Sequence, residues 1–178
     1  MNIKLTKPFK LKNTINYFVF LAVISFIVFL TNLVTDTYKQ FQPLEAQTVR
    51  FSKCTDGDTA HFIINGTDET VRFLAIDTPE TVKPNTPVQP YGKEASDRTC
   101  ELITNAKEIK LEYEETNKTD KYGRKLAWVF VDGILLQDDL VSKGLAKVAY
   151  LYDDYKYTSR IEASQSRSKD AAIGIWSK

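Results

Sequence analysis

The sequence predicts an α+β domain in which a small barrel of five short strands carries packed helices, behind an N-terminal apolar segment. Three observations support this fold. Apolar and polar residues alternate in five short runs, other stretches show helical spacing, and one uncharged run near the N-terminus is long enough to span a membrane. With 178 residues, 43% of them hydrophobic and 26% charged, the chain can bury one globular core.

The N-terminal segment is basic and then apolar. Four lysines, at positions 4, 7, 10 and 12, come before any acidic residue, and the run 13–35 that follows is uncharged. A basic flank of this kind stays in the cytoplasm, so the apolar run would place the rest of the chain outside the cell. We expect a cytoplasmic segment over 1–12, a transmembrane signal anchor over 13–35, a tether over 36–46 and a further domain over 47–178.

A cleaved signal peptide is the alternative to this anchor. Its apolar region usually has about 7 to 15 residues and ends at a small-x-small cleavage site. The run here is longer, and the late candidate site Leu44-Glu45-Ala46 has a bulky residue where a small one is required. The sequence therefore favours a single-pass protein of the cell membrane over a secreted protein.

The elements of the domain follow from periodicity and turn signals. Alternation predicts strands over 48–55, 58–65 and 69–76, and Asn65-Gly66 is typical of the hairpin turn between the second and third. Three prolines make 81–90 a loop. The pattern then predicts, in order, a helix over 91–106, strands over 108–114 and 125–131, and helices over 136–143 and 158–172. Five strands with a helix after the third fit a Greek-key barrel of the oligonucleotide-binding (OB) type with three packed helices.

Three polar clusters contain the candidate site residues. They are Asp56-Gly57-Asp58-Thr59, Arg72 with Asp77-Thr78-Pro79-Glu80, and Lys121-Tyr122-Gly123-Arg124. Taken singly, each is explained as a turn, a strand end or a loop. Crowding argues against that explanation, because two carboxylates three residues apart, beside Asp58, repel one another unless a cation lies among them. Oxygen ligands select calcium or magnesium and guanidinium groups match phosphate oxygens, so together the clusters indicate phosphodiester cleavage.

Composition excludes several other functions. After the first four lysines the chain has 20 basic and 23 acidic residues, so it lacks the global basic charge of a non-specific nucleic-acid binder. A single histidine, His61, is too few for a two-histidine ribonuclease mechanism or a credible serine triad. His61, Cys54 and Cys100 also lack the spacing of a zinc site. A metal ion with carboxylates remains the best hydrolytic mechanism.

Six motifs, in this order, resemble those of the staphylococcal nuclease (thermonuclease) family. They are Asp-Gly-Asp-Thr, Val-Arg-Phe-Leu-Ala-Ile-Asp-Thr-Pro-Glu, Tyr-Gly-Lys-Glu-Ala-Ser, Thr-Asp-Lys-Tyr-Gly-Arg-Lys-Leu-Ala, Gly-Leu-Ala-Lys-Val-Ala-Tyr and Ile-Trp-Ser. The similarity runs from about Val49 to the C-terminus. It implies an OB-fold barrel and a calcium-dependent, sugar-nonspecific nuclease that leaves 3′-phosphates on DNA and RNA products.

The resemblance assigns a metal site to the second cluster and to Asp58. Asp58, Asp77 and the backbone carbonyl of Thr78 would bind Ca²⁺, and Glu80 would orient or deprotonate the attacking water. Only two charged protein ligands imply weak calcium binding, with a dissociation constant on the order of 0.1 to 1 mM, which calcium outside the cell would satisfy.

The resemblance also assigns phosphate and nucleotide contacts. Arg72 and Arg124 would grip the scissile phosphate and stabilise the extra negative charge of the transition state. Contacts to the terminal phosphate and the nucleotide would come from Lys121, Tyr122, Tyr150 and Tyr152. One departure concerns the loop after Glu80, which has only Lys83 where the family often carries several lysines. That departure affects backbone binding and leaves the chemistry unchanged.

The two cysteines allow two interpretations. Cys54 lies in the first predicted strand and Cys100 in the first predicted helix of the domain, and both follow the export segment, where oxidation is permitted. A disulfide and a pair of free buried thiols both fit this placement. A disulfide would stabilise the domain without touching the catalytic residues.

A catalytically silent OB-fold module that binds nucleic acid at the membrane is the alternative function. Such a binder need not keep every residue of the catalytic set, yet all five are present: Asp58, Arg72, Asp77, Glu80 and Arg124. The sequence therefore favours an enzyme, a hydrolase whose substrates are DNA and RNA. We expect a monomeric nuclease domain held at the membrane by the N-terminal helix.

Overall fold

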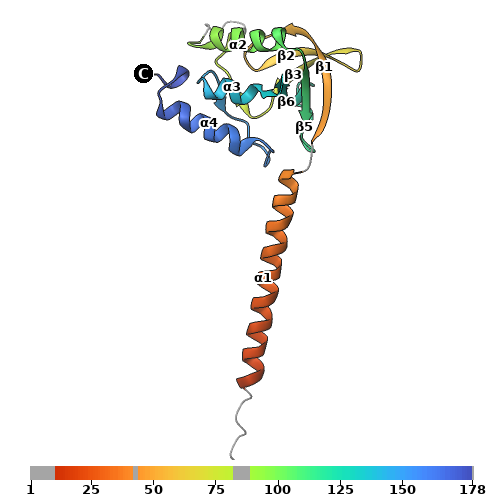
Figure 1. Cartoon of the computed structure of the whole chain (residues 1–178), viewed down its shortest axis with the longest axis vertical. Helices are drawn as coiled ribbons and strands as arrows, with labels where there is room; N and C mark the ends of the chain where they lie inside the picture. The colour runs from red at the N-terminus through yellow and green to blue at the C-terminus, as the bar shows by residue number, and fades with distance from the viewer. Residues whose placement is uncertain (1–10, 42–43, 82–88, 178) are drawn as a thin grey trace, which may run out of the picture. The chain divides into compact units, whose positions relative to one another are not determined.

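The computed structural model describes residues 11–41, 44–81 and 89–177, and side chains at the two ends of the first helix are outside this description. The predicted cytoplasmic segment 1–12 therefore lies almost wholly outside the described residues, as does most of the predicted loop 81–90, including Lys83. The chain forms two compact units, 1–42 and 43–178. Each unit is considered by itself (Figure 1).

The first unit is one long helix, α1 (Leu11–Phe41). Its stretch Tyr17–Val34 has a mean hydropathy of 2.4, and none of it is buried against protein. This helix is long and apolar enough to cross a membrane, a property that N-terminal signal sequences share. The stretch 36–46, expected to be a tether, is helical as far as Phe41 and is a strand from Glu45 onward.

The second unit contains a closed barrel of five strands, as the sequence predicts. The strands are β1 (Glu45–Cys54), β2 (Thr59–Ile64), β3 (Thr67–Phe73), β5 (Ile109–Tyr113) and β6 (Lys125–Val131). Antiparallel pairs join β3 to β2, β2 to β1, β1 to β5 and β5 to β6. A parallel pairing between β3 and β6 closes the cylinder. In this pairing Arg72 lies opposite Leu126, and this register brings Arg72 and the loop before β6 to the same cavity.

The β2–β3 hairpin turns at Asn65-Gly66, where both residues have positive φ, 53° and 85°. Two positive φ values match a type I′ turn, which explains why Asn-Gly predicted it. The third strand is shorter than predicted. It ends at Phe73 because Ala75 adopts the left-handed region at φ 61°, and the chain then forms the short strand β4 (Ile76–Asp77). This strand pairs with β8 (Lys147–Val148), which the sequence pattern did not predict.

The core of this unit is filled by large apolar side chains, and buried polar groups within it are hydrogen-bonded. Trp128 is fully buried, and its indole Nε1 donates to Glu114 Oε1 at 2.6 Å. Gln137 is also fully buried; its Nε2 donates to the carbonyl of Ala127, and its Oε1 accepts from the backbone N–H of Val129. Buried polar groups need such partners, so these contacts fix β6 within the core.

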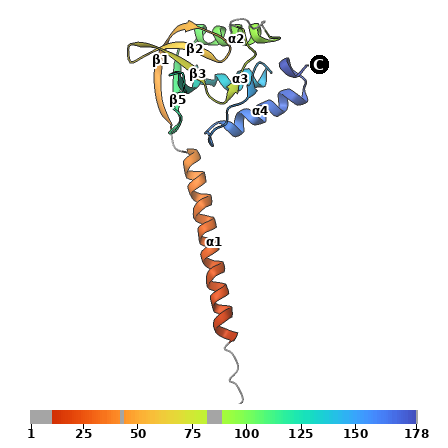
Figure 2. The same cartoon turned by 180° about the vertical axis from the view of Figure 1, so that it is seen from behind.

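Three helices pack on the barrel, as predicted: α2 (Gly92–Asn105), α3 (Leu136–Ser142) and α4 (Thr158–Asp170), with β7 (Ile134–Leu135) before α3 and a 3₁₀ turn, η1 (Gly174–Trp176), at the end. In both views α3 and α4 lie side by side (Figures 1 and 2). Asp138 of α3 pairs with Arg160 of α4, and Asp139 of α3 pairs with Arg98 of α2. A disulfide joins Cys54 at the end of β1 to Cys100 on α2.

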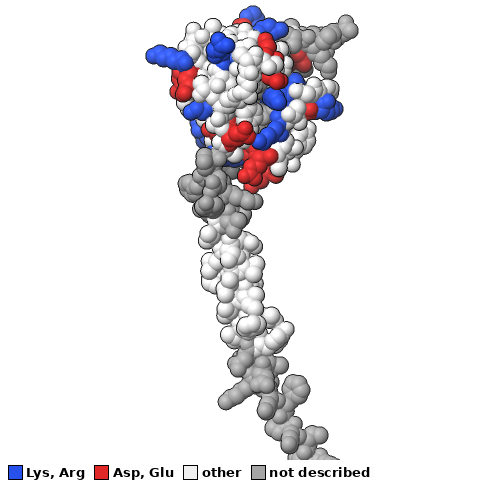
Figure 3. All heavy atoms as spheres, turned by 90° about the vertical axis from the view of Figure 1, so that its right-hand side faces the viewer, with Lys and Arg blue, Asp and Glu red and all other residues white. Residues whose placement is uncertain are grey.

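The surface of this unit mixes both signs of charge. Figure 3 shows lysine and arginine side chains interspersed with aspartate and glutamate over one face, with no single-sign field across that view. This agrees with the near balance of charges in the sequence. Any recognition of a polyanion must therefore depend on a local group of cations.

Candidate active site

All ten residues predicted for the active site line one cavity of about 680 Å³. They come from four parts of the chain: the β1–β2 loop, the end of β3 with the segment after it, the loop before β6, and the segment after β8. The ten residues are Asp58, Arg72, Asp77, Thr78, Glu80, Lys121, Tyr122, Arg124, Tyr150 and Tyr152. The volume is typical of a ligand pocket.

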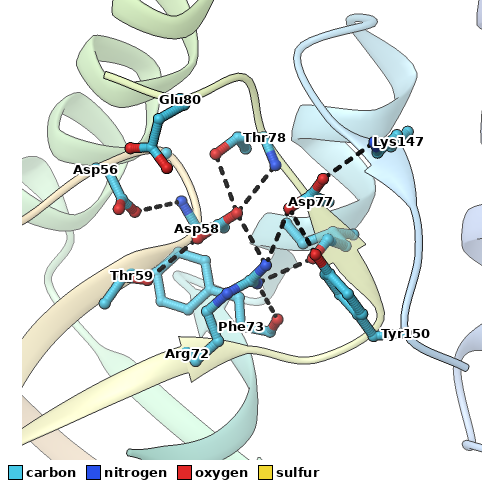
Figure 4. A network of polar contacts seen from close by, with 12 residues as sticks. Asp56, Asp58, Thr59, Arg72, Phe73, Asp77, Thr78, Glu80, Lys147 and Tyr150 are labelled. Atoms are coloured by element: carbon cyan, nitrogen blue, oxygen red, sulfur yellow. Dashed lines mark hydrogen bonds and ion pairs between the residues drawn. The ribbon is translucent and has the colours of Figure 1, made fainter. Parts of the chain in front are cut away.

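Asp58 and Arg72 form a buried ion pair at the base of the cavity. Asp58 is 6% exposed and Arg72 is 9% exposed, and the distance from Arg72 Nη2 to Asp58 Oδ2 is 3.1 Å. The same Asp58 oxygen accepts from the backbone N–H and the hydroxyl of Thr78, and Asp58 Oδ1 accepts from Thr59 Oγ1 (Figure 4). The Asp58 carboxylate is thus held in one orientation.

The other guanidinium nitrogen of Arg72 is anchored to the backbone. Nη1 donates to the carbonyls of Phe73 and Ile76, both at 2.9 Å. Because these carbonyls bracket the turn at Ala75, the turn itself fixes the arginine. Arg72 is therefore a preorganised cation, unlike an arginine that points freely from a strand.

Asp77 contacts the same nitrogen of Arg72 as Asp58 does and has three polar neighbours. Its Oδ1 is 3.4 Å from Arg72 Nη2 and accepts from the Tyr150 hydroxyl at 3.4 Å, while its Oδ2 is 3.1 Å from Lys147 Nζ. The antiparallel register of β4 and β8 places Lys147 directly opposite Asp77. Figure 4 shows Asp77 between Arg72, Tyr150 and Lys147.

Two further carboxylates, Asp56 and Glu80, line the same side of the cavity (Figure 4). Asp56 Oδ1 accepts from the backbone N–H of Asp58 at 3.1 Å. Burial, and next the charge of Asp58, raise the pKa of Asp56 from 3.8 to about 6. Glu80 Oε1 accepts from the backbone N–H of Thr81 at 3.1 Å. The site thus concentrates carboxylates in a confined space, as the crowding in the sequence suggested.

The second half of the cavity is built around Arg124. Its Nε donates to Asp120 Oδ2 at 2.7 Å, and Asp120 Oδ1 accepts from the backbone N–H groups of Tyr122 and Arg124. Burial alone would raise the pKa of Asp120, but the hydrogen bonds and charge of Arg124, with the Tyr122 N–H, hold it below 3.8. Arg124 also lies over the Tyr122 ring, 5.5 Å from its centroid.

Closure of the barrel brings the two arginines to one cavity. Arg124 immediately precedes β6, and β6 pairs with β3 so that Leu126 is opposite Arg72. Residues 52 positions apart in the sequence therefore approach the same space from neighbouring strands. An anionic group that enters the cavity meets one deeply held guanidinium and one at the side.

Exposed aromatic rings surround the cavity. Tyr122 is 72% exposed and Tyr152 is 76% exposed, and the Tyr150 and Tyr152 ring centroids lie 6.3 Å apart. Arg72 lies 5.6 Å from the centroid of the Tyr150 ring. Large exposed rings beside guanidinium groups are suited to stacking against flat, apolar ligand faces.

The donor set fits a hard cation. Asp58 and Asp77 both lie within ion-pair distance of one nitrogen atom, Arg72 Nη2, so they can serve a shared positive charge. Carboxylate and carbonyl oxygens suit Ca²⁺, Mg²⁺ or Mn²⁺ better than softer metals. Within the described part of the chain, no three His, Cys, Asp or Glu side chains converge as closely as the ligands of one ion do. Water and backbone oxygens would have to complete the coordination.

Three residues of this site were not among the predicted site residues: Asp56, Asp120 and Lys147. Asp56 and Asp120 stand inside the motifs that were singled out, adjacent to predicted ligands, so proximity in sequence was the available signal. Lys147 also stands inside a quoted motif, Gly-Leu-Ala-Lys-Val-Ala-Tyr, but its contact with Asp77 depends on the β4–β8 pairing, which the sequence pattern did not predict. Cys54 and Cys100 were named as a possible disulfide. They are bonded, and Cys54 is the residue directly before the β1–β2 loop.

Comparison with known proteins shows which proteins this chain is similar to. A family model described as "Staphylococcal nuclease homologue" matches residues 70–178. The chain is 46% identical over 131 residues to endonuclease YncB of Bacillus subtilis, covering 73% of this chain and 62% of that protein. It is 46% identical over 131 residues to the SPbeta prophage-derived endonuclease YokF of the same organism, covering 73% of this chain and 44% of that protein. A thermonuclease of Staphylococcus hyicus is 44% identical over 131 residues, with 74% of this chain and 76% of that protein covered. The chain thus spans less than two thirds of the length of the two Bacillus relatives.

The pairing of Asp120 with Arg124 leads to a spectroscopic prediction. In the ¹⁵N-labelled full chain in detergent, the Arg124 Nε–H should exchange slowly with water, and Asp120→Ala should make this exchange fast. A carboxylate whose folded pKa is depressed keeps its contribution above the unfolded pKa and loses it only as the pH falls through the lower value. Slow exchange should therefore persist down to about pH 4. The Nε–H of Arg98, which is paired with Asp139, should be unchanged in the variant. Equal exchange of Arg124 in both proteins would contradict the pairing.

Proposed function

This chain belongs to the staphylococcal nuclease family, and on that premise we propose that it is a calcium-dependent nuclease that hydrolyses DNA and RNA and leaves 3′-phosphate products. One observation carries the proposal. A buried Asp58–Arg72–Asp77 network and the anchored Arg124 share one cavity that is surrounded by exposed tyrosines. This arrangement supplies the parts that cleavage of a phosphodiester requires: cations for the phosphate, carboxylates for a metal ion, and flat rings for bases.

The arginines supply the differential stabilisation. The five-coordinate phosphorus of the transition state carries more negative charge than the ground state, so fixed cations favour it. The Arg72 side chain needs little reorganisation when the transition state forms, because two backbone carbonyls already hold its Nη1. Asp120 does the same for Arg124 through the Nε–H. In this proposal both guanidinium groups bind the non-bridging oxygens of the scissile phosphate.

Asp58, Asp77 and the backbone carbonyl of Thr78 would hold the calcium ion. The bound ion would supply positive charge and polarise the phosphate. Thr78 also fixes Asp58 through its N–H and hydroxyl, so one residue both orients a ligand and donates another. Arg72 pairs with both aspartates and Lys147 also pairs with Asp77, which explains how the two carboxylates can lie close together. Glu80 would accept the proton of the attacking water.

Substrate contacts lie around the cavity. Tyr150 and Tyr152 would stack on the nucleotide, and Lys121 with Tyr122 would contact the terminal phosphate. Lys121 Nζ lies 5.0 Å from the centroid of the Tyr122 ring, so the charge and the ring are presented together. Stacking does not depend on base identity, in agreement with action on both DNA and RNA.

We also place the nuclease domain outside the cell. The helix α1 would act as a single-pass signal anchor, with the basic segment 1–12 in the cytoplasm. Secretion after cleavage of the helix is the competing arrangement. In this proposal the nuclease domain acts as a monomer.

Calcium dependence is the first test. The full chain in detergent should cleave single-stranded DNA, double-stranded DNA and RNA in calcium, and excess chelator should abolish this activity, because Asp58 and Asp77 need a cation for catalysis. A labelled oligonucleotide product should lose its 3′-phosphate to a 3′-phosphatase. Full activity in excess chelator would sink the mechanism. Binding of nucleic acid without cleavage in calcium would favour the catalytically silent OB-fold module instead.

Single substitutions test the assigned roles. Arg72→Ala and Arg124→Ala should each lower kcat by at least roughly 100-fold, as the loss of one preorganised donor does. Glu80→Gln should lower kcat strongly and leave calcium binding nearly intact. Arg160→Ala, which removes an exposed arginine paired with Asp138, should leave turnover close to wild type.

Arg72 needs a second variant because the structure buries it. Arg72→Ala leaves Asp58 as an unpaired buried charge, so we expect a loss of stability that the sequence did not suggest. Arg72→Lys keeps a charge but loses the fork-shaped donor geometry, so it should fold better and still be impaired. Near-normal turnover in Arg72→Lys and Arg124→Ala would remove the two arginines from the mechanism.

Membrane topology can be tested on intact cells that express the full chain. Added protease should release an active nuclease fragment if the domain lies outside. Protection of the domain until the cells are lysed would refute this orientation. A mature protein in the medium that starts near Gln47 would instead show cleavage of the signal.

A further inference from the structure

The loop that carries Asp58 is tied to helix α2 at three neighbouring positions. A Cβ placed on Gly57 would lie 2.9 Å from Ala95 Cβ, so the loop packs directly against the helix. The Thr99 hydroxyl donates to the carbonyl of Gly57 at 2.6 Å, and both Thr99 and Ala95 are fully buried. Cys100 is bonded to Cys54, the last residue before the loop begins.

This loop has little freedom of its own. Only four residues, 55–58, separate Cys54 from β2, and the Asp56 N–H donates back to the carbonyl of Thr59. On its other side the carbonyl of Asp58 accepts from the N–H of Phe73 at 2.8 Å. The loop is therefore held by backbone hydrogen bonds to the barrel strands and by its contacts with α2. A substitution at Gly57 would also collide with Thr78, at 2.7 Å from its hydroxyl.

Helix α2 is itself a fixed support. Arg98, one residue before Thr99, makes two hydrogen bonds to Asp139 of α3, from Nε at 2.8 Å and from Nη2 at 2.9 Å. Ile103, one turn further along α2, is buried in the core. A support anchored to both the core and a second helix can hold a loop position that would otherwise vary.

We propose that α2, through Thr99 and the Cys54–Cys100 disulfide, positions Asp58 for metal binding and thereby sets the affinity of the site for its cation. This rests on the proposed function, in which Asp58 is a calcium ligand. Thr99, Cys54 and Cys100 do not belong to the described lining of the cavity, so they act through the loop and are positioning residues. The sequence had suggested that a disulfide would stabilise the domain without touching the catalytic residues. In this proposal the bond has a second role, because it ties Cys54, the residue directly before the Asp58 loop, to α2.

The size of the effect follows from how metal sites respond to the loss of groups that orient their ligands. Such losses typically lower metal affinity about 10- to 100-fold. The proposed site has only two carboxylate ligands, so misplacement of one cannot be offset by others. Because the disulfide and Thr99 share the task, we expect each loss alone to be at the lower end, roughly 10-fold.

Calorimetric titration of the full chain in detergent with Ca²⁺ alone tests the proposal. The variants are Cys54→Ser with Cys100→Ser, Thr99→Val, which keeps the shape but loses the hydroxyl, and Thr99→Ser, which restores it. The first two should raise the calcium dissociation constant roughly 10-fold, and Thr99→Ser should return it to within about threefold of wild type. At saturating calcium, kcat and the KM for DNA should stay near wild type.

Val131→Ala controls for general loss of stability. Val131 is buried on β6 and is not among the described residues of the cavity lining. Truncating it should lower the melting temperature and leave the calcium affinity unchanged. If Val131→Ala weakens calcium binding as much as the loss of the disulfide, the positioning role is overturned.

The outcomes separate this inference from the proposed function. Wild-type protein that neither binds calcium nor cleaves DNA in calcium would refute the proposed function. Wild-type protein that binds calcium, with the disulfide-free and Thr99→Val variants within about twofold of it, would overturn the positioning role alone. If the serine pair does not fold, the Thr99→Val and Thr99→Ser pair still decides the question.

Discussion

The buried guanidinium of Arg72 is the interaction on which the rest of the site depends. A charge with 9% exposure is tolerated only when it is paired and hydrogen-bonded, and Arg72 meets this condition with two backbone carbonyls and two carboxylates. The partners come from two segments: the β1–β2 loop supplies Asp58, and the stretch from the end of β3 through β4 supplies the two carbonyls and Asp77. The need to satisfy one buried cation thus holds these segments around a single point.

Closure of the barrel extends this arrangement to the other half of the cavity. The parallel pairing of β3 with β6 sets Arg72 beside Leu126, and the loop that ends at Arg124 is thereby brought to the edge of the same space. On the opposite side, α2 holds the Asp58 loop through Thr99 and the disulfide. The catalytic groups proposed here therefore lie at strand ends and on loops, and the strand pairings and α2 fix where those segments lie.

Much of this could be predicted from the sequence, for identifiable reasons. Asn65-Gly66 predicted the hairpin because few other dipeptides accept two positive φ values. Alternating and helical patterns predicted the five barrel strands and three helices, since each buries one face in the core. The second strand pair, β4 with β8, was missed because two-residue strands carry no periodicity. Because this pairing was not predicted, the contact of Lys147 with Asp77 was not predicted either. For the same reason the predicted third strand ended at residue 76, three residues beyond the end of β3.

The sequence by itself determined the residue types of the site, because carboxylates, arginines and tyrosines cluster in short motifs whose chemistry is local. It also determined the apolar N-terminal helix, since length and composition alone decide whether a helix could cross a membrane. Only the tertiary structure decided that Arg72 is buried and not an outward-facing strand residue, and that Lys147 pairs with Asp77. It also decided that Cys100 meets Cys54 behind Asp58. The physical reason is that burial, ion pairing and disulfide geometry depend on distances between segments far apart in the chain, which strand register and barrel closure set and no local pattern records.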